Sequence, residues 1–153
     1  MKIAFVGYGN VGAPLADHLQ KLGHDVTLAV NDAGSASLRK LLATNPHLGS
    51  ADPKHAVEGA DVVFLATPFQ ANETALKNVA GELTGKILVD CTNPVGPGLT
   101  HGLNNAQSGT EMIQRLVPGA KVVKAFTIYG FENFEDNNYA GYNVEPVMLF
   151  LRQ

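Results

Sequence analysis

The chain has 153 residues, of which 45% are hydrophobic and 16% are charged, and its net charge is −3. This length can bury the core of one domain, and the lack of a basic cluster argues against nucleic acid or an anionic membrane as a partner. The single cysteine, Cys91, cannot form an intramolecular disulfide, and no apolar run approaches the roughly 20 residues of a membrane span. We therefore expect one domain over residues 1–153 and a cytoplasmic location.

The chain begins with the pattern of a strand, a glycine-rich turn and a helix. Residues 2–6 form an apolar run that predicts a buried strand. The turn that follows has the pattern G-x-G-x-x-G and consists of Gly7, Tyr8, Gly9, Asn10, Val11 and Gly12. In this pattern the first glycine permits a tight turn, the second lets a pyrophosphate approach the backbone, and the third lets the helix pack closely on the strand. Apolar residues then recur at helical spacing as far as Leu22, and Gly23 predicts the end of the helix. The sequence thus predicts a dinucleotide site, with a purely structural glycine turn as the alternative.

A second strand is expected over residues 24–30, followed by a turn at residues 31–34. Together with the first strand and the helix it makes the β–α–β unit of roughly 30 residues that a mononucleotide-binding half requires. Asp32 follows Gly12 at about the 20-residue spacing of a carboxylate that binds the ribose 2′-hydroxyl of NAD. Because the strand is expected to end at Val30, Asp32 has a second interpretation as a cap of the next turn.

Helical and strand patterns alternate along the rest of the chain. Helices are expected over residues 37–42, 72–83 and 110–117, strands over residues 61–66, 86–91 and 121–126, and a loop over residues 45–54. This alternation predicts an α/β fold with a Rossmann-type, doubly wound parallel sheet in a single domain. The tail at residues 144–151 is apolar and has to be shielded from water. It would be shielded as a sixth strand of the sheet or by contact with the partner in a homodimer.

In such sheets ligands bind beyond the carboxyl ends of the strands. The loops expected there carry no His–Asp pair, no carboxylate pair and no Cys/His cluster with metal spacing. This favours hydride transfer between two bound cofactors, which needs position and orientation more than an acid or a base. Four aromatic residues lie in or near the loop expected at residues 127–131: Phe126, Tyr129, Phe131 and Phe134. They either pack against the tail or offer a stacking surface to a flavin-like ring.

Six segments of the chain together resemble the NADPH-dependent F420 reductase-like proteins, which are dinucleotide-binding oxidoreductases. The segments are residues 5–12, 23–26, 60–66, 90–94, 108–111 and 123–127. The ordered set is more specific than the glycine motif alone, especially Thr92-Asn93-Pro94 and Lys124-Ala125-Phe126. The resemblance implies a Rossmann fold, NADP(H), and hydride exchange with the deazaflavin F420 or a flavin; membrane relatives use a similar domain in metalloreductases.

The resemblance also implies roles for individual residues. The glycine turn would hold the pyrophosphate, and the coenzyme would further contact Thr67 and Pro68 after the third predicted strand, Asn93 and Pro94 on the nicotinamide side, and Thr127 and Ile128 near the hydride-transfer face. Where family members usually carry Ser-Arg or Arg-Arg to grip the 2′-phosphate, this chain has Asn31 and Asp32, so NAD is possible beside NADP. Relative to family members, we also expect this chain to be truncated at its C-terminus.

Two classes of function follow from these patterns. The first is an NADP-dependent oxidoreductase that transfers hydride between the nicotinamide and F420 or a flavin-like acceptor. The second is a dinucleotide-binding module without its own catalysis, either a sensor or the remnant of a longer enzyme. In both cases the expected ligands are small molecules, with no nucleic acid, membrane or metal involved, and the expected assembly is a homodimer.

Overall fold

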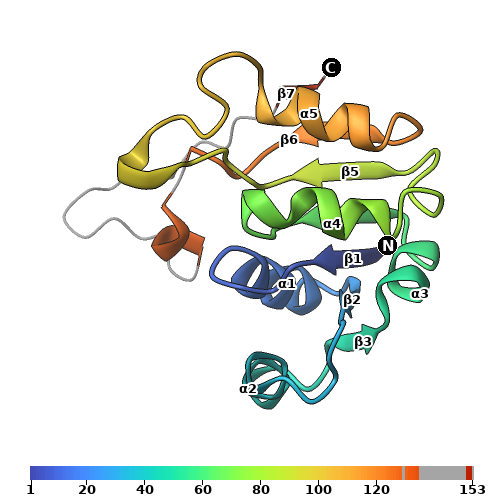
Figure 1. The fold of residues 1–153 in the computed structure, drawn as a ribbon. Coiled ribbons are helices and arrows are strands. Elements are labelled where there is room, and N and C mark those ends of the chain that lie inside the picture. The colour runs from blue at the N-terminus through green and yellow to red at the C-terminus, as the bar shows by residue number, and fades with distance from the viewer. Residues whose placement is uncertain (129, 135–150, 153) are drawn as a thin grey trace.

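The computed structural model describes residues 1–128, 130–134 and 151–152, and in this part of the chain seven strands form one sheet. The strands are β1 (Lys2–Val6), β2 (Asp25–Ala29), β3 (Gly49–Ala51), β4 (Val62–Leu65), β5 (Ile87–Asp90), β6 (Lys121–Lys124) and β7 (Leu151–Arg152). Their order across the sheet is β3-β2-β1-β4-β5-β6-β7 (Figure 1). Strands β1 to β6 are parallel and β7 pairs antiparallel with β6. This arrangement confirms the predicted Rossmann-type fold.

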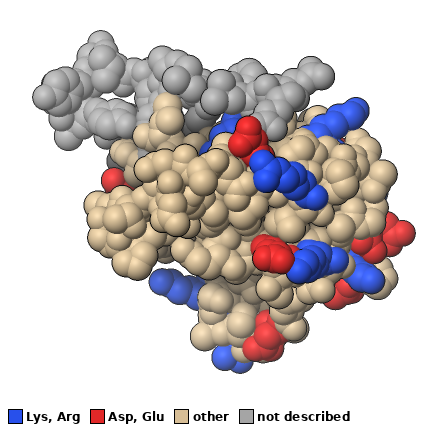
Figure 2. Space-filling view, turned by 45° about the horizontal axis from the view of Figure 1, so that its top comes forward, with Lys and Arg blue, Asp and Glu red and all other residues tan. Residues whose placement is uncertain are grey.

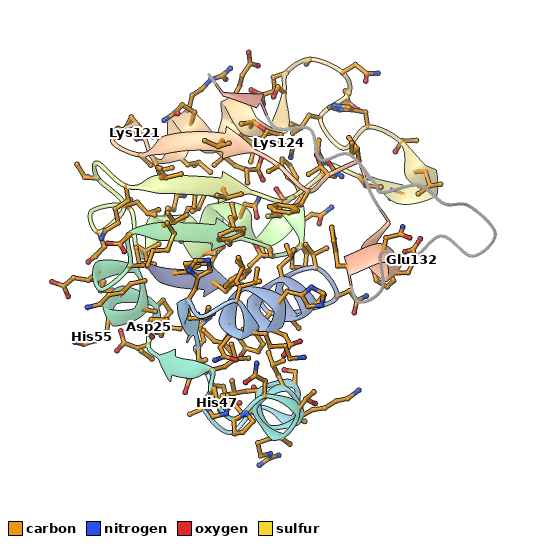
Figure 3. The ribbon with its side chains drawn as sticks, turned by 180° about the vertical axis from the view of Figure 1, so that it is seen from behind. Asp25, His47, His55, Lys121, Lys124 and Glu132 are labelled. Carbon is orange, nitrogen blue, oxygen red and sulfur yellow. The ribbon has the colours of Figure 1, made fainter. Side chains whose placement is uncertain are left out.

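Helices cover both faces of the sheet. They are α1 (Gly12–Lys21), α2 (Ala36–Thr44), α3 (Pro53–Glu58), α4 (Asn72–Lys77) and α5 (Gly109–Leu116). Apolar side chains of α3, α4 and α5 pack on one face of the sheet in a core with Val63 and Leu88. Those of α1 and α2 pack on the other face with Phe5 and Leu28, and this face is turned to the viewer in Figure 3. Because the helices enclose the strands on both faces, side chains on both sides of each strand are buried. This explains the continuous apolar runs from which the strands were predicted.

Side chains at the helix ends explain where three of the helices begin. Ser35 accepts a hydrogen bond from the Leu38 N–H at the start of α2, and Asp52 accepts one from the His55 N–H at the start of α3. Ser108 and Glu111 form a reciprocal capping box at the start of α5. Each of these bonds satisfies a backbone group that has no partner within its helix.

The prediction of a plain loop at residues 45–54 was wrong, because this stretch contains β3 and the start of α3. Strand β3 has only three residues, Gly49–Ala51, and no apolar alternation, so its sequence carries no strand signal. It is held by pairing with β2, where Gly49 lies opposite Thr27. A Cβ atom at Gly49 would lie 3.2 Å from the Thr27 hydroxyl oxygen, so β2 and β3 approach each other closely at this glycine.

The helix predicted over residues 72–83 ends earlier, at Lys77. Turns follow as far as Gly85, whose φ of +79° favours glycine and does not suit a helix. Leu76, Val79 and Leu83 are all fully buried. The apolar spacing therefore marked the buried positions correctly, although a turn rather than a helix presents the last two of them.

Part of the expected tail strand lies within the described residues. Leu151 and Arg152 form β7 beside β6, while residues 144–150 and Tyr129 lie outside the described part of the chain.

No helix in the described part is long and apolar enough to cross a membrane. On the face shown in Figure 2, the described acidic and basic side chains are interspersed and do not form a broad area of one sign.

Candidate functional site

The glycine turn lies between β1 and α1 at the carboxyl edge of the sheet, together with the loops that follow β4, β5 and β6 (Figure 1). Gly7 has a φ of +99°, and a Cβ atom there would lie 2.6 Å from the carbonyl carbon of Ala66 and 2.7 Å from the nitrogen of Thr67. A Cβ atom at Gly12 would lie 2.2 Å from the Gly7 carbonyl oxygen. At Gly9, by contrast, an added Cβ atom would meet nothing within 4 Å. Two glycines are therefore required by packing, and the middle one faces open space.

The start of α1 is suited to an anion. Val11 occupies its N-cap position, no side chain among the described residues caps it, and its first turn contains no acidic residue. The first N–H groups of a helix have no partner within the helix, and its N-terminus carries a partial positive charge. Open space at Gly9 beside such a helix end is the arrangement in which backbone N–H groups bind phosphate.

Asn31 and Asp32 follow β2 and are both exposed. One carboxylate oxygen of Asp32 accepts a hydrogen bond of 2.8 Å from the Gly34 N–H, and the Asp32 carbonyl oxygen accepts one of 3.1 Å from the Ser35 N–H. These bonds favour the interpretation of Asp32 as a residue that shapes the turn before α2. Contact between Asp32 and a ribose stays a prediction.

The other predicted residues lie at the ends of β4, β5 and β6. Thr67 lies against Gly7, and its hydroxyl donates a hydrogen bond of 2.7 Å to the side-chain oxygen of Asn72. The Asn93 side-chain amide donates to the Thr127 carbonyl oxygen at 3.2 Å, so the loops after β5 and β6 are joined. The structure thus brings the predicted residues to one edge, while their contact with a coenzyme stays a prediction.

A group of buried polar residues beside this edge was absent from the predicted site. Asp90, at the end of β5, is fully buried, and its carboxylate accepts hydrogen bonds from Thr92, Thr110 and Lys124. Asn72 is also fully buried and donates a hydrogen bond of 2.9 Å to the Thr92 hydroxyl. A signal for the group exists in the sequence, because a charged residue lies within each of two neighbouring strand patterns, at positions 90 and 124. In the sheet, these two residues lie opposite each other.

The aromatic residues near the site pack mostly on one another. Phe5 stacks on Phe64, which contacts Phe126, and Phe126 meets Phe134 edge to face with ring centroids 6.1 Å apart. This continuous packing supports the structural interpretation of Phe126 and Phe134. Phe131 is half exposed and is the described member of the predicted aromatic cluster that offers its ring to solvent.

A cavity of about 160 Å³ lies at the opposite edge of the sheet, where Lys2, Asp25 and His55 contribute to its lining. Figure 3 shows Asp25 and His55 toward the same end of the strands as Lys121 and away from Lys124. None of the residues predicted from the sequence lines this cavity. Among the described residues, no group of three or more His, Cys, Asp or Glu side chains has the geometry of a metal site.

Cys91 is buried, and burial raises the pKa of its thiol to about 12. The reactive form of cysteine is the thiolate, and the free side chain has a pKa of about 8.5. We therefore expect native Cys91 to react with an aromatic disulfide reagent at least about a hundredfold more slowly than the urea-unfolded chain at mildly alkaline pH. Equal rates in the two states would show that the thiol of native Cys91 is accessible and ionised, and would contradict this expectation.

Comparison with known proteins yields matches over most of the chain. The sequence model of a protein family described as NADP oxidoreductase coenzyme F420-dependent matches residues 2–94. The metalloreductase STEAP3 of Rattus norvegicus is 31% identical over 128 residues, which cover 83% of this chain and 24% of the rat protein. The F420-dependent NADP reductase of Methanothermobacter marburgensis is 33% identical over 102 residues, which cover 62% of this chain and 46% of that protein.

A crystal structure from Arthrobacter sp. FB24, provisionally described as an F420-dependent NADP-reductase, is similar in both sequence and fold. It is 36% identical with a TM-score of 0.79, and the match covers 87% of this chain and 65% of that chain. This chain spans about a quarter of the rat metalloreductase and just under half of the Methanothermobacter reductase.

Proposed function

This chain belongs to the family described as NADP oxidoreductase coenzyme F420-dependent, and from that membership we propose that it transfers hydride between NADP(H) and a deazaflavin or flavin-like acceptor. Its membership of the NAD(P)-dependent oxidoreductases rests on the family match over residues 2–94. The identity of the acceptor is the proposed part. The observation that carries the coenzyme-binding part of the proposal is the open backbone at Gly9 beside the start of α1, where no described side chain caps the helix.

The residues at the carboxyl edge of the sheet fit such a coenzyme. The backbone N–H groups between Gly7 and Gly12 would bind the pyrophosphate, because the space above Gly9 admits it and the end of α1 attracts its charge. Asn31 and Asp32 would lie near the adenosine ribose, and Asn93 near the nicotinamide. A bound nicotinamide supplies the hydride, so the task of these side chains is to hold and orient it.

The choice of acceptor is supported by one relative, which is named an F420-dependent NADP reductase. Another relative is named a metalloreductase, so a ferric chelate is included among the acceptors to be tested. Hydride transfer between two ring systems depends on position and orientation more than on an acid or a base, and the proton that accompanies the hydride onto a deazaflavin or flavin is taken from solvent. Half-exposed Phe131 gives a planar acceptor one aromatic surface near this edge.

The assay that identifies the acceptor follows the oxidation of NADPH by the loss of NADPH absorbance. F420, FMN and a ferric chelate are added as acceptors in separate reactions. We expect turnover with F420 or FMN, and each acceptor without protein serves as the blank. If NADPH binds but no acceptor is reduced, the alternative of a dinucleotide-binding module without its own catalysis is correct. If neither NADPH nor NADH binds, both interpretations are wrong.

We expect only modest preference for NADP over NAD. Asn31 stands where an arginine would pair with the 2′-phosphate, and a charge-assisted pair of that kind contributes about 1.5–3 kcal/mol, or roughly 10- to 100-fold in affinity. Exposed Arg39 and Lys40 on α2 provide a weaker attraction. Asn31→Arg should therefore raise NADP⁺ affinity at least about fivefold and leave NAD⁺ affinity unchanged. A ratio of NADP⁺ to NAD⁺ affinity above about a thousand in the parent chain would show that the phosphate is recognised elsewhere.

We also propose a cytoplasmic location, and a homodimer for which the exposed apolar side chains of Val95 and Leu99 on the loop after β5 are the supporting observation. Such side chains gain from being covered by another chain. Light scattering tests the assembly: a mass near twice 16.2 kDa is expected, and a mass near 16.2 kDa at micromolar concentration would contradict it.

A further inference from the structure

The buried carboxylate of Asp90 joins three segments of the chain. One of its oxygens accepts from the backbone N–H of Thr92 at 2.9 Å and from the Thr92 hydroxyl at 2.8 Å. The other accepts from the Thr110 hydroxyl on α5 at 2.9 Å and from the Lys124 ammonium group at the end of β6 at 3.0 Å. With four donors, the carboxylate is fully satisfied in a site without solvent exposure.

The Lys124 ammonium group makes a second contact, with the carbonyl oxygen of Thr92. It therefore holds the peptide that connects Thr92 to Asn93, directly before the segment predicted to meet the nicotinamide. Three residues beyond Lys124, the Thr127 carbonyl oxygen accepts from the Asn93 side chain at 3.2 Å. Asn93 is thus held from its backbone side by Lys124 and from its side-chain end by Thr127.

The same hydrogen-bonded group reaches the glycine turn. The Asn72 side-chain amide donates to the Thr92 hydroxyl, and the Asn72 side-chain oxygen accepts from the Thr67 hydroxyl at 2.7 Å. Thr67 in turn lies against Gly7. A continuous path of hydrogen bonds therefore runs from Lys124 through Thr92 and Asn72 to Thr67, which lies beside the glycine turn.

We propose that Lys124 is a positioning residue, which fixes the Asn93–Pro94 segment through the Thr92 carbonyl and the Asp90 carboxylate and so orients the nicotinamide half of the coenzyme. The inference rests on the proposed function, because it presumes that this edge binds NADP(H). Lys124 itself need not touch the coenzyme. Its loss should affect the nicotinamide half and spare the adenosine half, which binds beside β2 at the other side of the glycine turn.

Lys86 provides a matched control. It is a partly buried lysine just before β5, and its ammonium group donates to two backbone carbonyl oxygens, those of Glu58 and Ala60, as that of Lys124 donates to the Thr92 carbonyl oxygen. These contacts lie at the opposite edge of the sheet, before β5 and at the end of α3. Lys86→Met removes hydrogen bonds from a lysine to backbone carbonyl oxygens without disturbing the loops of the candidate site.

The test compares two probes by calorimetry, NADPH and 2′,5′-ADP, the second of which contains only the adenosine half. For Lys124→Met we expect NADPH affinity to fall at least about tenfold and 2′,5′-ADP affinity to change less than about twofold. Lys86→Met should leave both affinities unchanged. If Lys124→Met does not fold, the double variant Asp90→Asn/Lys124→Met, which leaves no unpaired charge, is measured in the same way.

Each outcome of this test either supports or contradicts a positioning role for Lys124. An unchanged NADPH affinity, or an equal loss for both probes, would show that Lys124 has no specific role at the nicotinamide half. If both variants fail to fold, the group acts in folding and the inference is wrong. If the parent chain binds neither probe, the proposed function itself fails and the inference fails with it. Binding by the parent chain therefore separates the two failures.

Discussion

Gly9→Val is expected to lower NADPH affinity by at least about a hundredfold while the protein stays folded. An added Cβ atom at this position meets nothing within 4 Å, so the side chain enters open space instead of the core. That space is where a pyrophosphate would approach the backbone N–H groups. Loss of two charge-assisted hydrogen bonds of about 1.5–3 kcal/mol each is a loss of at least about two decades in affinity.

A matched control separates this effect from a general cost of adding valine. Gly81 is also exposed, also has open space for a Cβ atom, and lies in the turn between α4 and β5, at the opposite edge of the sheet. Gly81→Val should bind NADPH as the parent chain does. Thermal unfolding of all three proteins checks that they are folded. Unchanged NADPH affinity in Gly9→Val would mean that the glycine turn has only a structural role.

Asp90→Ala is expected to lower the free energy of unfolding by about 3–5 kcal/mol, because it leaves the Lys124 ammonium group without its buried counter-ion. The side chain of Lys124 is only 19% exposed, so water compensates little. The Thr110 hydroxyl and the Thr92 N–H lose their acceptor in the same change. A loss of this size is a large share of the 5–15 kcal/mol that stabilises a typical domain.

Urea unfolding measures this loss, and Asp61→Ala is its control. The Asp61 carboxylate also accepts a backbone hydrogen bond, of 2.8 Å from the Lys2 N–H, but it lies at the exposed edge where water can replace it. Its removal should cost less than about 1 kcal/mol. If the two substitutions cost the same, the group around Asp90 does not behave as a buried ion pair.

The elements that could be predicted from sequence are those whose signals are local. A run of apolar residues before a glycine turn predicts β1 and α1, because the turn imposes a backbone conformation that Gly7 adopts at a φ of +99°. Alternation of helices and strands then predicts a parallel sheet, whose carboxyl edge gathers the loops after Val6, Leu65 and Asp90. The candidate site followed from that rule and from the resemblance, without knowledge of any contact.

The features that were missed depend on contacts between distant segments. Strand β3 exists because Gly49–Ala51 pairs with β2, and nothing within those three residues signals it. The group around Asp90 combines residues as far apart as positions 67 and 124, whose meeting depends on the order β4-β5-β6 in the sheet. The motifs that contain Asp90 and Lys124 supported the resemblance, but their bond to each other follows only from the register of β5 and β6.

The central claim is that a nicotinamide dinucleotide binds at the carboxyl edge of the sheet, and titration of the ¹⁵N-labelled chain with NADP⁺ tests it most directly. We expect the amide signals of Gly7–Gly12, Asn31, Thr67, Asn93 and Thr127 to shift together with a single dissociation constant. Shifts that are absent, or that are confined to Lys2, Asp25 and His55 around the cavity at the opposite edge, would contradict the claim.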